Sequence, residues 1–237
     1  MEHHYLKLLD TYILDDVLME LSGLALLNEH TFIAVQDEKG IIYHLNKNNG
    51  EIIAKNKFKK KGDFEGVALV SSEEFYAVTS EGELYRISSL GSEKVSKKIK
   101  GVEIEGLCYA PQKHKLLLAV KRGEDKYIRV LGFDLHNMQW DQEDHIKLKK
   151  DRSTKQFHCS GIALDSKGNC FLLSHRSKQL LILNQAKEIL QLVDLSPFDI
   201  FQPESILIEN DTCLYIGSEG KKGIAKPKLY KFSYTKP

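Results

Sequence analysis

The sequence has few of the residues that mark specialised protein classes. It contains only 5 Pro and 16 Gly among 237 residues, which excludes collagen-like and low-complexity chains. No apolar run approaches the roughly 20 residues of a membrane-spanning helix, so we expect no transmembrane segment. Neither sign of charge is in excess, because 34 Lys and Arg residues balance 33 Asp and Glu residues. Without a basic excess or a recognisable motif, we expect no nucleic-acid partner.

Cysteine is scarce, and its spacing does not indicate a disulfide framework or a zinc site. The four cysteines form no CxxC pair and lie in apolar runs, which predicts buried free thiols. The first residues lack the basic and then apolar pattern of a secretory leader, so the chain as written shows no export signal. Hydrophobic residues make up 42% and charged residues 28%, which is typical of an ordinary globular protein. We also expect the protein to be a monomer.

A short motif recurs five times and organises the whole chain. Its aligned positions are separated by 43, 40, 55 and 44 residues, a period typical of a four-stranded propeller blade. The aligned residues are Gly23, Gly66, Gly106, Gly161 and Ser205. Six blades are less favoured than five, because no sixth copy is visible.

Each copy continues with the same series of strands. A second apolar strand such as Phe32–Val35 precedes an alternating third strand such as Ile41–Leu45, where period 2 indicates a half-buried strand. Fourth strands, such as 94–99 in the second copy, are more polar, as outer edges should be. The fifth copy has only three strands, and the alternating run at 5–13 can supply its fourth.

The repeat therefore predicts an all-β fold, a five-bladed β-propeller of four-stranded antiparallel blades whose last blade is completed by the N-terminal strand. We expect one domain, 1–237, with repeats at approximately 18–62, 63–102, 103–157, 158–201 and 202–237 and the outer strand from 5–13. The pair Trp140-Asp141 occurs once and does not recur as a WD40 signature. The absence of any Gly-Gly pair disfavours a kelch propeller.

With these motifs the sequence resembles the SdiA-regulated family of bacterial five-bladed propellers, which is distantly similar to NHL-repeat propellers. The resemblance covers nearly the full chain, through Leu21-Ser22-Gly23-Leu24, Asp63-Phe64-Glu65-Gly66, Ile104-Glu105-Gly106-Leu107, Cys159-Ser160-Gly161-Ile162 and Gln202-Pro203-Glu204. It implies a propeller that binds Ca²⁺, with no settled enzymatic activity. It also implies the periplasm or cell envelope if a leader was trimmed, and the cytoplasm otherwise. The chain departs from the family at Ser205, where Gly or Ala is usual.

Carboxylates are placed to meet at one mouth of the central channel. In a propeller, the loop that enters each blade and the loop between its second and third strands lie on the same face. The residues expected there are Asp37, Glu38, Glu65, Glu81, Glu105, Glu204 and Glu219. Because Ca²⁺ takes six to eight oxygen ligands, this set predicts a calcium site, with Glu65 and Glu105 on adjacent blades as its first candidates. The alternative is structural: each Glu accepts a backbone hydrogen bond at its turn.

Basic residues interrupt the acidic pattern in the third and fourth blades. Lys121, Arg122 and Arg176 occupy loop positions there, and they predict binding of a ligand that carries anionic groups. Lysine runs, including Lys97-Lys98 and Lys100, precede the entry motifs. They either hold an anionic ligand or lipid surface or simply block edge-to-edge strand pairing.

Catalytic signals are weak. Ser160-Gly161 supplies half of a G-x-S-x-G motif and begins a strand rather than a strand-to-helix turn, and His175 lies on the equivalent loop as a candidate base. We therefore expect a non-catalytic, Ca²⁺-binding propeller that holds a small-molecule or protein partner at its channel mouth. The alternatives are a metal-dependent hydrolase of the lactonase or phytase type, and a pure interaction scaffold whose repeated Glu residues are structural.

Overall fold

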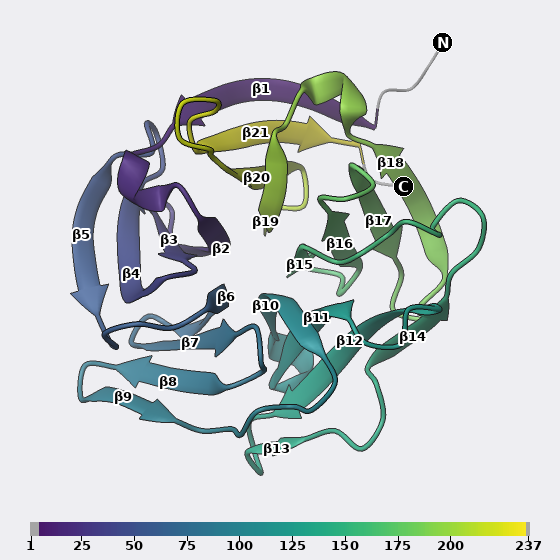
Figure 1. Cartoon of the computed structure of the whole chain (residues 1–237), viewed down its shortest axis with the longest axis horizontal. Helices are drawn as coiled ribbons and strands as arrows, with labels where there is room; N and C mark the ends of the chain where they lie inside the picture. The colour runs from purple at the N-terminus through teal and green to yellow at the C-terminus, as the bar shows by residue number, and fades with distance from the viewer. Residues whose placement is uncertain (1–4, 236–237) are drawn as a thin grey trace.

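Five antiparallel sheets surround a central axis in the computed structural model, which describes residues 5–235 (Figure 1). Blades 1 and 2 contain β2 (Leu21–Asn28), β3 (Thr31–Gln36), β4 (Lys39–Asn46) and β5 (Ile52–Lys57), then β6 (Phe64–Ser71), β7 (Glu74–Thr79), β8 (Leu84–Ser88) and β9 (Gly91–Lys94). Blade 3 contains β10 (Glu103–Ala110), β11 (Lys115–Arg122), β12 (Tyr127–Asp134), β13 (Gln139–Trp140) and β14 (Ile146–Lys149). Blades 4 and 5 contain β15 (Gly161–Leu164), β16 (Cys170–Ser174), β17 (Gln179–Leu183) and β18 (Ile189–Asp194), then β19 (Gln202–Glu209), β20 (Cys213–Glu219) and β21 (Lys228–Tyr234).

The N-terminal strand closes the ring, as predicted. β1 (Leu6–Ile13) pairs with β21 in antiparallel register from Leu6↔Tyr234 to Ile13↔Lys228. Figure 1 shows it as the outermost strand of blade 5. The structure thus confirms a five-bladed all-β propeller whose last blade combines both ends of the described chain.

The core lies between neighbouring blades, because each sheet buries both of its faces. In β3 all six residues are buried, and alternate side chains point to opposite neighbours. Ile33 and Val35 pack with Phe64 of blade 2, whereas Phe32 packs with Tyr215 of blade 5 at 4.8 Å between ring centroids. The sequence repeats because every blade must bury both faces of its sheet against its two neighbours.

Four glycines let the inner strands approach closely at the axis. A Cβ on Gly23 would lie 2.8 Å from the Cα of Gly66, and one on Gly106 would lie 3.0 Å from the Cα of Gly161. Blade 5 has Ser205 at the equivalent position, in register with Gly217 on β20. In blade 5 the glycine is on the second strand, as Gly217, and its lack of a side chain leaves room for that of Ser205.

Two outer edges differ from the expected pattern. The outer strand of blade 2 was predicted at 94–99 but is β9 at Gly91–Lys94, because Gly91, at φ 126°, ends a tight turn that brings the chain back at once. In blade 3 the edge is divided: β13 and β14 pair with opposite ends of β12. Trp140 lies within β13 and packs against Phe133.

Regular helix is limited to three 3₁₀ turns in the described residues: η1 (Asp16–Leu18), η2 (Pro111–Lys113) and η3 (Ser196–Phe198). Within residues 5–235, no helix has the length and apolar character needed to cross a bilayer. The four cysteines are free, as predicted; Cys159 and Cys170 are buried, and Cys108 and Cys213 are half-buried.

Candidate functional site

A ring of polar residues precedes the axial glycines at the start of the inner strands. The ring consists of Ser22, Glu65, Glu105, Ser160 and Glu204. Its two serines bridge neighbouring blades: the Ser22 hydroxyl donates to the Phe64 carbonyl at 2.5 Å, and the Ser160 hydroxyl donates to the Pro203 carbonyl at 2.7 Å. The three glutamates instead bring carboxyl groups to the mouth of the channel.

Glu65 lies in the most unfavourable electrostatic surroundings of this ring. Burial raises its pKa from 4.5 to about 9, and the charges of Glu105, Asp63 and Asp37 add to the increase. Burial also raises the pKa of Glu105 to about 7, although Lys121 opposes that increase. These carboxyls therefore hold protons near neutral pH when no external cation compensates them.

Two loop carboxyls complete the acidic group. Burial and the neighbouring Glu20, which shares a hydrogen bond, raise the pKa of Asp37 to about 7. Burial and the charges of Glu204, Asp37 and Glu105 raise that of Glu219 to about 8. Oδ1 of Asp37 and Oε2 of Glu204 are buried and have no hydrogen-bond partner in the described part of the chain. We call Asp37, Glu65 and Glu219 the acidic half of the mouth.

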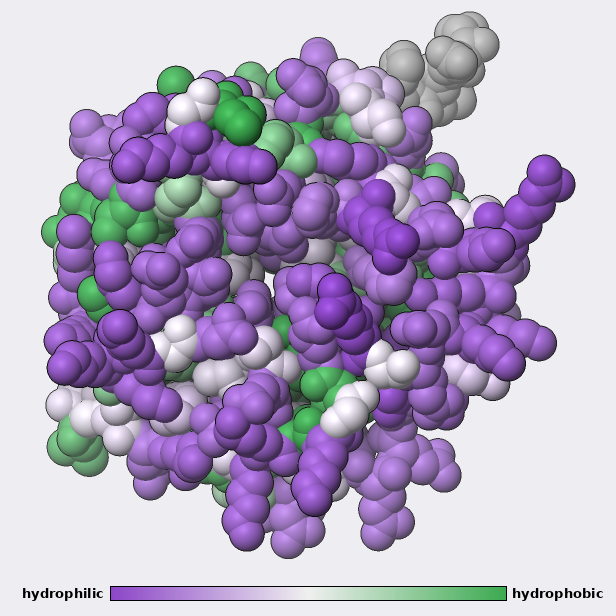
Figure 2. Space-filling view, in the orientation of Figure 1, coloured by the Kyte–Doolittle hydropathy of each residue, from purple (hydrophilic) through white to green (hydrophobic). Residues whose placement is uncertain are grey.

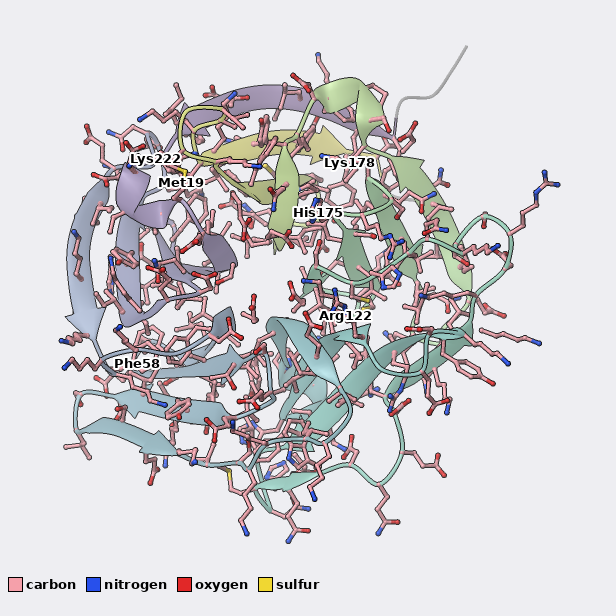
Figure 3. The ribbon with its side chains drawn as sticks, in the orientation of Figure 1. Met19, Phe58, Arg122, His175, Lys178 and Lys222 are labelled. Atoms are coloured by element: carbon pink, nitrogen blue, oxygen red, sulfur yellow. The ribbon has the colours of Figure 1, made fainter. Side chains whose placement is uncertain are left out.

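Blades 3 and 4 supply the basic half. Nζ of Lys121 lies 2.6 Å from Oε1 of Glu105, and Nε of Arg122 lies 3.3 Å from Oε2 of Glu103. Nδ1 of His175 lies 2.9 Å from Oε1 of Glu204. Figure 3 shows Arg122 and His175 beside the centre of the ring, and hydrophilic side chains predominate there in Figure 2.

Arg176 extends the basic half outward. Its Nη1 atom lies 3.3 Å from Nε2 of His158, and its side chain is exposed. The structure thus brings the sequence-predicted cations Lys121, Arg122 and Arg176 to the same two blades. It pairs two of them with carboxylates of the entry strand β10.

Two of the predicted metal ligands lie outside this arrangement. Glu38 is exposed on the turn between β3 and β4. Glu81 is also exposed, and its carboxylate forms an ion pair with Lys98. The other five, Asp37, Glu65, Glu105, Glu204 and Glu219, influence one another electrostatically at the mouth.

Ser160 and His175 are close in space, but they are not arranged as a nucleophile and its base. The Ser160 hydroxyl donates to the Pro203 carbonyl and accepts the backbone N–H of His175 at 3.0 Å. The His175 ring points to Glu204 instead. Both side chains thus fix the junction between blades 4 and 5.

Sequence reasoning missed a second polar level of the mouth. Glu20, Asp63 and Glu103 stand two residues before Ser22, Glu65 and Glu105. The pairing register of each of these inner strands shifts at this point, so strand alternation does not fix the direction of the side chains. Glu20 contacts Asp37, and Glu103 contacts Lys121 at 3.5 Å. The recurrence of an acidic residue two positions before the motif residue was readable in the sequence.

The mouth fits a cation chemically, but its ligands are not gathered around one point. Within residues 5–235, no group of three or more His, Cys, Asp or Glu side chains is placed to hold a metal ion. Glu105 and Glu204 already have Lys121 and His175 as partners. The raised carboxyl pKa values and the unpartnered Asp37 oxygen fit a hard cation, which would require the side chains of the acidic half to converge.

Comparison with known proteins agrees with the repeat and the fold. The SdiA-regulated family model matches residues 1–222. The chain belongs to the SdiA-regulated family. No curated protein matches the sequence of this SdiA-regulated propeller.

Solved structures share the fold of this SdiA-regulated protein at low sequence identity. Glutaminyl cyclase from Myxococcus xanthus has a TM-score of 0.66 at 14% identity, covering 98% of this chain and 97% of its own. The PQQ-bound aldose sugar dehydrogenase from Streptomyces coelicolor has a TM-score of 0.66 at 13% identity, covering 97% and 98%. At these identities the likeness shows the fold alone.

Proposed function

We propose that this SdiA-regulated propeller is a non-catalytic binding protein that takes Ca²⁺ at the acidic half of its channel mouth. One observation carries the proposal: carboxyls from blades 1, 2 and 5, namely Asp37, Glu65 and Glu219, have pKa values raised to between about 7 and 9 by burial and mutual repulsion. A bound divalent cation would reverse that effect, since nearby positive charge favours the ionised form.

The donor chemistry favours calcium over softer metals. Every candidate ligand in the acidic half is a carboxylate oxygen, which hard cations prefer. Ca²⁺ accepts irregular coordination by six to eight oxygens, some of them from water, whereas Mg²⁺ demands near-ideal octahedral geometry. Side chains from three different blades suit the more tolerant ion.

The ligand of the whole mouth would carry an anionic group. Arg122, whose side chain is 71% exposed, and the exposed Arg176 lie in the basic half, on blades 3 and 4. Calcium would contribute further positive charge beside them, so a carboxylate or phosphate on a small molecule or protein partner could bridge the ion and the arginines. We propose that the protein does this as a monomer.

Hydrolysis receives less support from the geometry than binding. The Ser160 hydroxyl proton is engaged by the Pro203 carbonyl, and the His175 ring contacts Glu204. A metal-dependent hydrolase would still be compatible with an acidic mouth, so activity on lactones and phosphoesters is worth measuring together with calcium content. Loss of that activity in Glu65→Gln would favour the enzyme.

Calorimetric titration of chelator-stripped protein tests the proposal. Ca²⁺ should release measurable heat and raise Tm, whereas Mg²⁺ should bind more weakly. Asp37→Asn and Glu65→Gln should each weaken Ca²⁺ binding. The control is Glu73→Gln, because Glu73 is exposed on the turn at the opposite end of the β6–β7 hairpin. Absence of heat and of any thermal shift in the wild type, or equal binding in all variants, would refute the calcium site and leave an interaction scaffold.

A further inference from the structure

A large groove separates the outer parts of blades 2 and 3. Its volume is about 1010 Å³, at the upper end of the usual size for ligand pockets. It exists because β9 ends at Lys94 and because the outer edge of blade 3 is divided between β13 and β14. The irregular connection 95–102 forms one wall, and β12 with its divided edge forms the other. Figure 1 shows the connection from β9 to β10 passing near β12 and β13.

The floor of this groove is apolar and aromatic. Trp140, the only tryptophan of the chain, packs edge-on against Phe133 with their ring centroids 5.0 Å apart. Leu131, Met138 and Val102 are half-buried beside them and line the same space. An apolar body placed here would remove these side chains from water, which stabilises binding by about 25 cal/mol per Å² of apolar area buried.

The acidic residues of the blade 3 wall are compensated by partners of their own. Asp144 accepts two hydrogen bonds from Arg129, at 2.6 and 2.8 Å. Asp141 accepts one from Lys115 at 2.6 Å. Their negative charge is therefore not available to a ligand.

The opposite wall carries the positive charge that remains. Lys97 and Lys100 are exposed on the connection from β9 to β10, and neither forms an ion pair within residues 5–235. Lys98 between them is paired with Glu81. The acid Glu143 is the lining carboxylate without an ion pair in the described residues, so two free lysines stand against one free acid. The groove thus combines an aromatic floor with a net positive rim.

We propose that this groove is a second binding site, for a small amphipathic organic anion. The apolar, preferably aromatic, body of the ligand lies against Trp140, and its carboxylate, sulfonate or phosphate group lies at Lys97 and Lys100. The site is on the outside of the ring and uses none of the residues of the channel mouth. This proposal does not depend on calcium binding at the channel mouth.

Two dyes that differ by one group test the proposal on the full chain. 8-Anilinonaphthalene-1-sulfonate carries an anionic sulfonate, and N-phenyl-1-naphthylamine has the same rings without it. Both should change the emission of Trp140, which arises from this groove because the chain has no other tryptophan. The sulfonate should bind with a 1:1 stoichiometry and more tightly than the neutral dye.

The double variant Lys97→Gln, Lys100→Gln should weaken binding of the sulfonate about three- to tenfold and leave the neutral dye unchanged, given the modest strength of exposed charge pairs. The control, Lys60→Gln, Lys61→Gln, removes the same charge from the equivalent connection between blades 1 and 2, where both lysines are exposed, and should change neither dye. The proposal is overturned if Trp140 emission does not respond, if both dyes bind equally, or if the two double variants behave alike.

Discussion

Nζ of Lys121 on β11 lies 2.6 Å from Oε1 of Glu105 on β10, so the protein supplies its own cation to one of the buried carboxylates at the channel mouth. Only 8% of the Glu105 side chain is exposed, compared with 33% of the Lys121 side chain. The ammonium therefore reaches the carboxylate from the solvent side. It divides the mouth into a compensated half and the acidic half, which lacks such a partner.

Replacing Lys121 with Met should destabilise the protein in a pH-dependent way. At pH 8 the buried Glu105 carboxylate would lose its partner, which should lower the free energy of unfolding by about 2 kcal/mol, less than for a fully buried pair because the Lys121 side chain is 33% exposed. At pH 5 the loss should shrink, because Glu105, with a pKa raised to about 7 by burial, is already protonated. Urea unfolding at both pH values measures the difference. Adding Glu105→Gln to Lys121→Met should restore most of the stability at pH 8; an equal loss at both pH values would contradict the pairing.

The protein without calcium should lose stability as pH rises. Between about pH 4.5 and 9 the folded state keeps a proton on Glu65 that the unfolded state releases, because burial raises the folded pKa to about 9. The folded state binds more protons over this range, so the free energy of unfolding falls with pH. Glu219 and Asp37 act in the same direction, with pKa values raised to about 8 and about 7.

Glu65→Gln should flatten this dependence and stabilise the protein at pH 8.5, by about 1.4 kcal/mol for each pH unit over which the folded state alone retains the Glu65 proton. Denaturant titrations in the presence of chelator, from pH 5 to 9, measure the slope directly. A wild-type protein of constant stability over this range, or a variant with an unchanged slope, would show that the Glu65 carboxyl is not strained by its surroundings.

Calcium binding should strengthen with pH and release protons. Ca²⁺ must displace the protons that the raised pKa values of Asp37, Glu65 and Glu219 retain, so its affinity at pH 8 should exceed that at pH 6 by about tenfold or more. Calorimetry in two buffers with different ionisation enthalpies counts the protons released. Affinity independent of pH would place the ion away from the acidic half.

Ser160→Ala should lower the stability of the protein and should not abolish any hydrolytic activity. The hydroxyl links β15 to the Pro203 carbonyl and accepts the His175 N–H, so its removal should lower the free energy of unfolding by about 1–3 kcal/mol. Ser22→Ala, which removes the equivalent bond to the Phe64 carbonyl, is the matched comparison. Thermal unfolding of both variants should show similar losses. Hydrolysis of a lactone or phosphoester by the wild type, abolished only by Ser160→Ala, would assign the serine to chemistry.

A side chain at the axial glycines should force blades apart. In Gly66→Ala the new Cβ would lie 2.7 Å from the backbone nitrogen of Leu107, which cannot move without shifting β10. We expect a loss of about 1–3 kcal/mol. Ser205→Gly makes the opposite change in blade 5 and should be tolerated far better. Comparable Tm values for the two variants would contradict a tight axial contact.

The five-bladed fold could be predicted because burial on both faces forces the same pattern on every blade. Phe32 and Ile33 illustrate the constraint, since they pack against different neighbouring blades. The position of the outer strand of blade 2 was predicted wrongly because all four residues of β9 are exposed, so no burial pattern fixes where the strand begins and ends.

The site was predictable in its location and less so in its pairing. The rule that entry loops meet the loops between second and third strands, such as β3–β4, at one mouth correctly brought Asp37 and Glu65 together. It could not separate Asp37 from the exposed Glu38 beside it, because side-chain direction within a tight turn follows from the turn geometry and not from a periodic pattern. It also gave no sign that Lys121 reaches Glu105, which depends on the register between β10 and β11.

The pairing of β1 with β21 makes the order of synthesis matter. During translation the first strand emerges some two hundred residues before its partner, so its hydrogen-bonding edge must wait unpaired while blades 1 to 4 are made. Such long-range contacts are slow to form. Leu8 and Leu9 are 38% and 50% exposed even in the finished ring, and in the nascent chain this segment offers an apolar edge to other chains. The risk of misassembly is therefore greatest just before β21 is synthesised. A chaperone that covered residues 6–13 until then would prevent this segment from pairing with other chains.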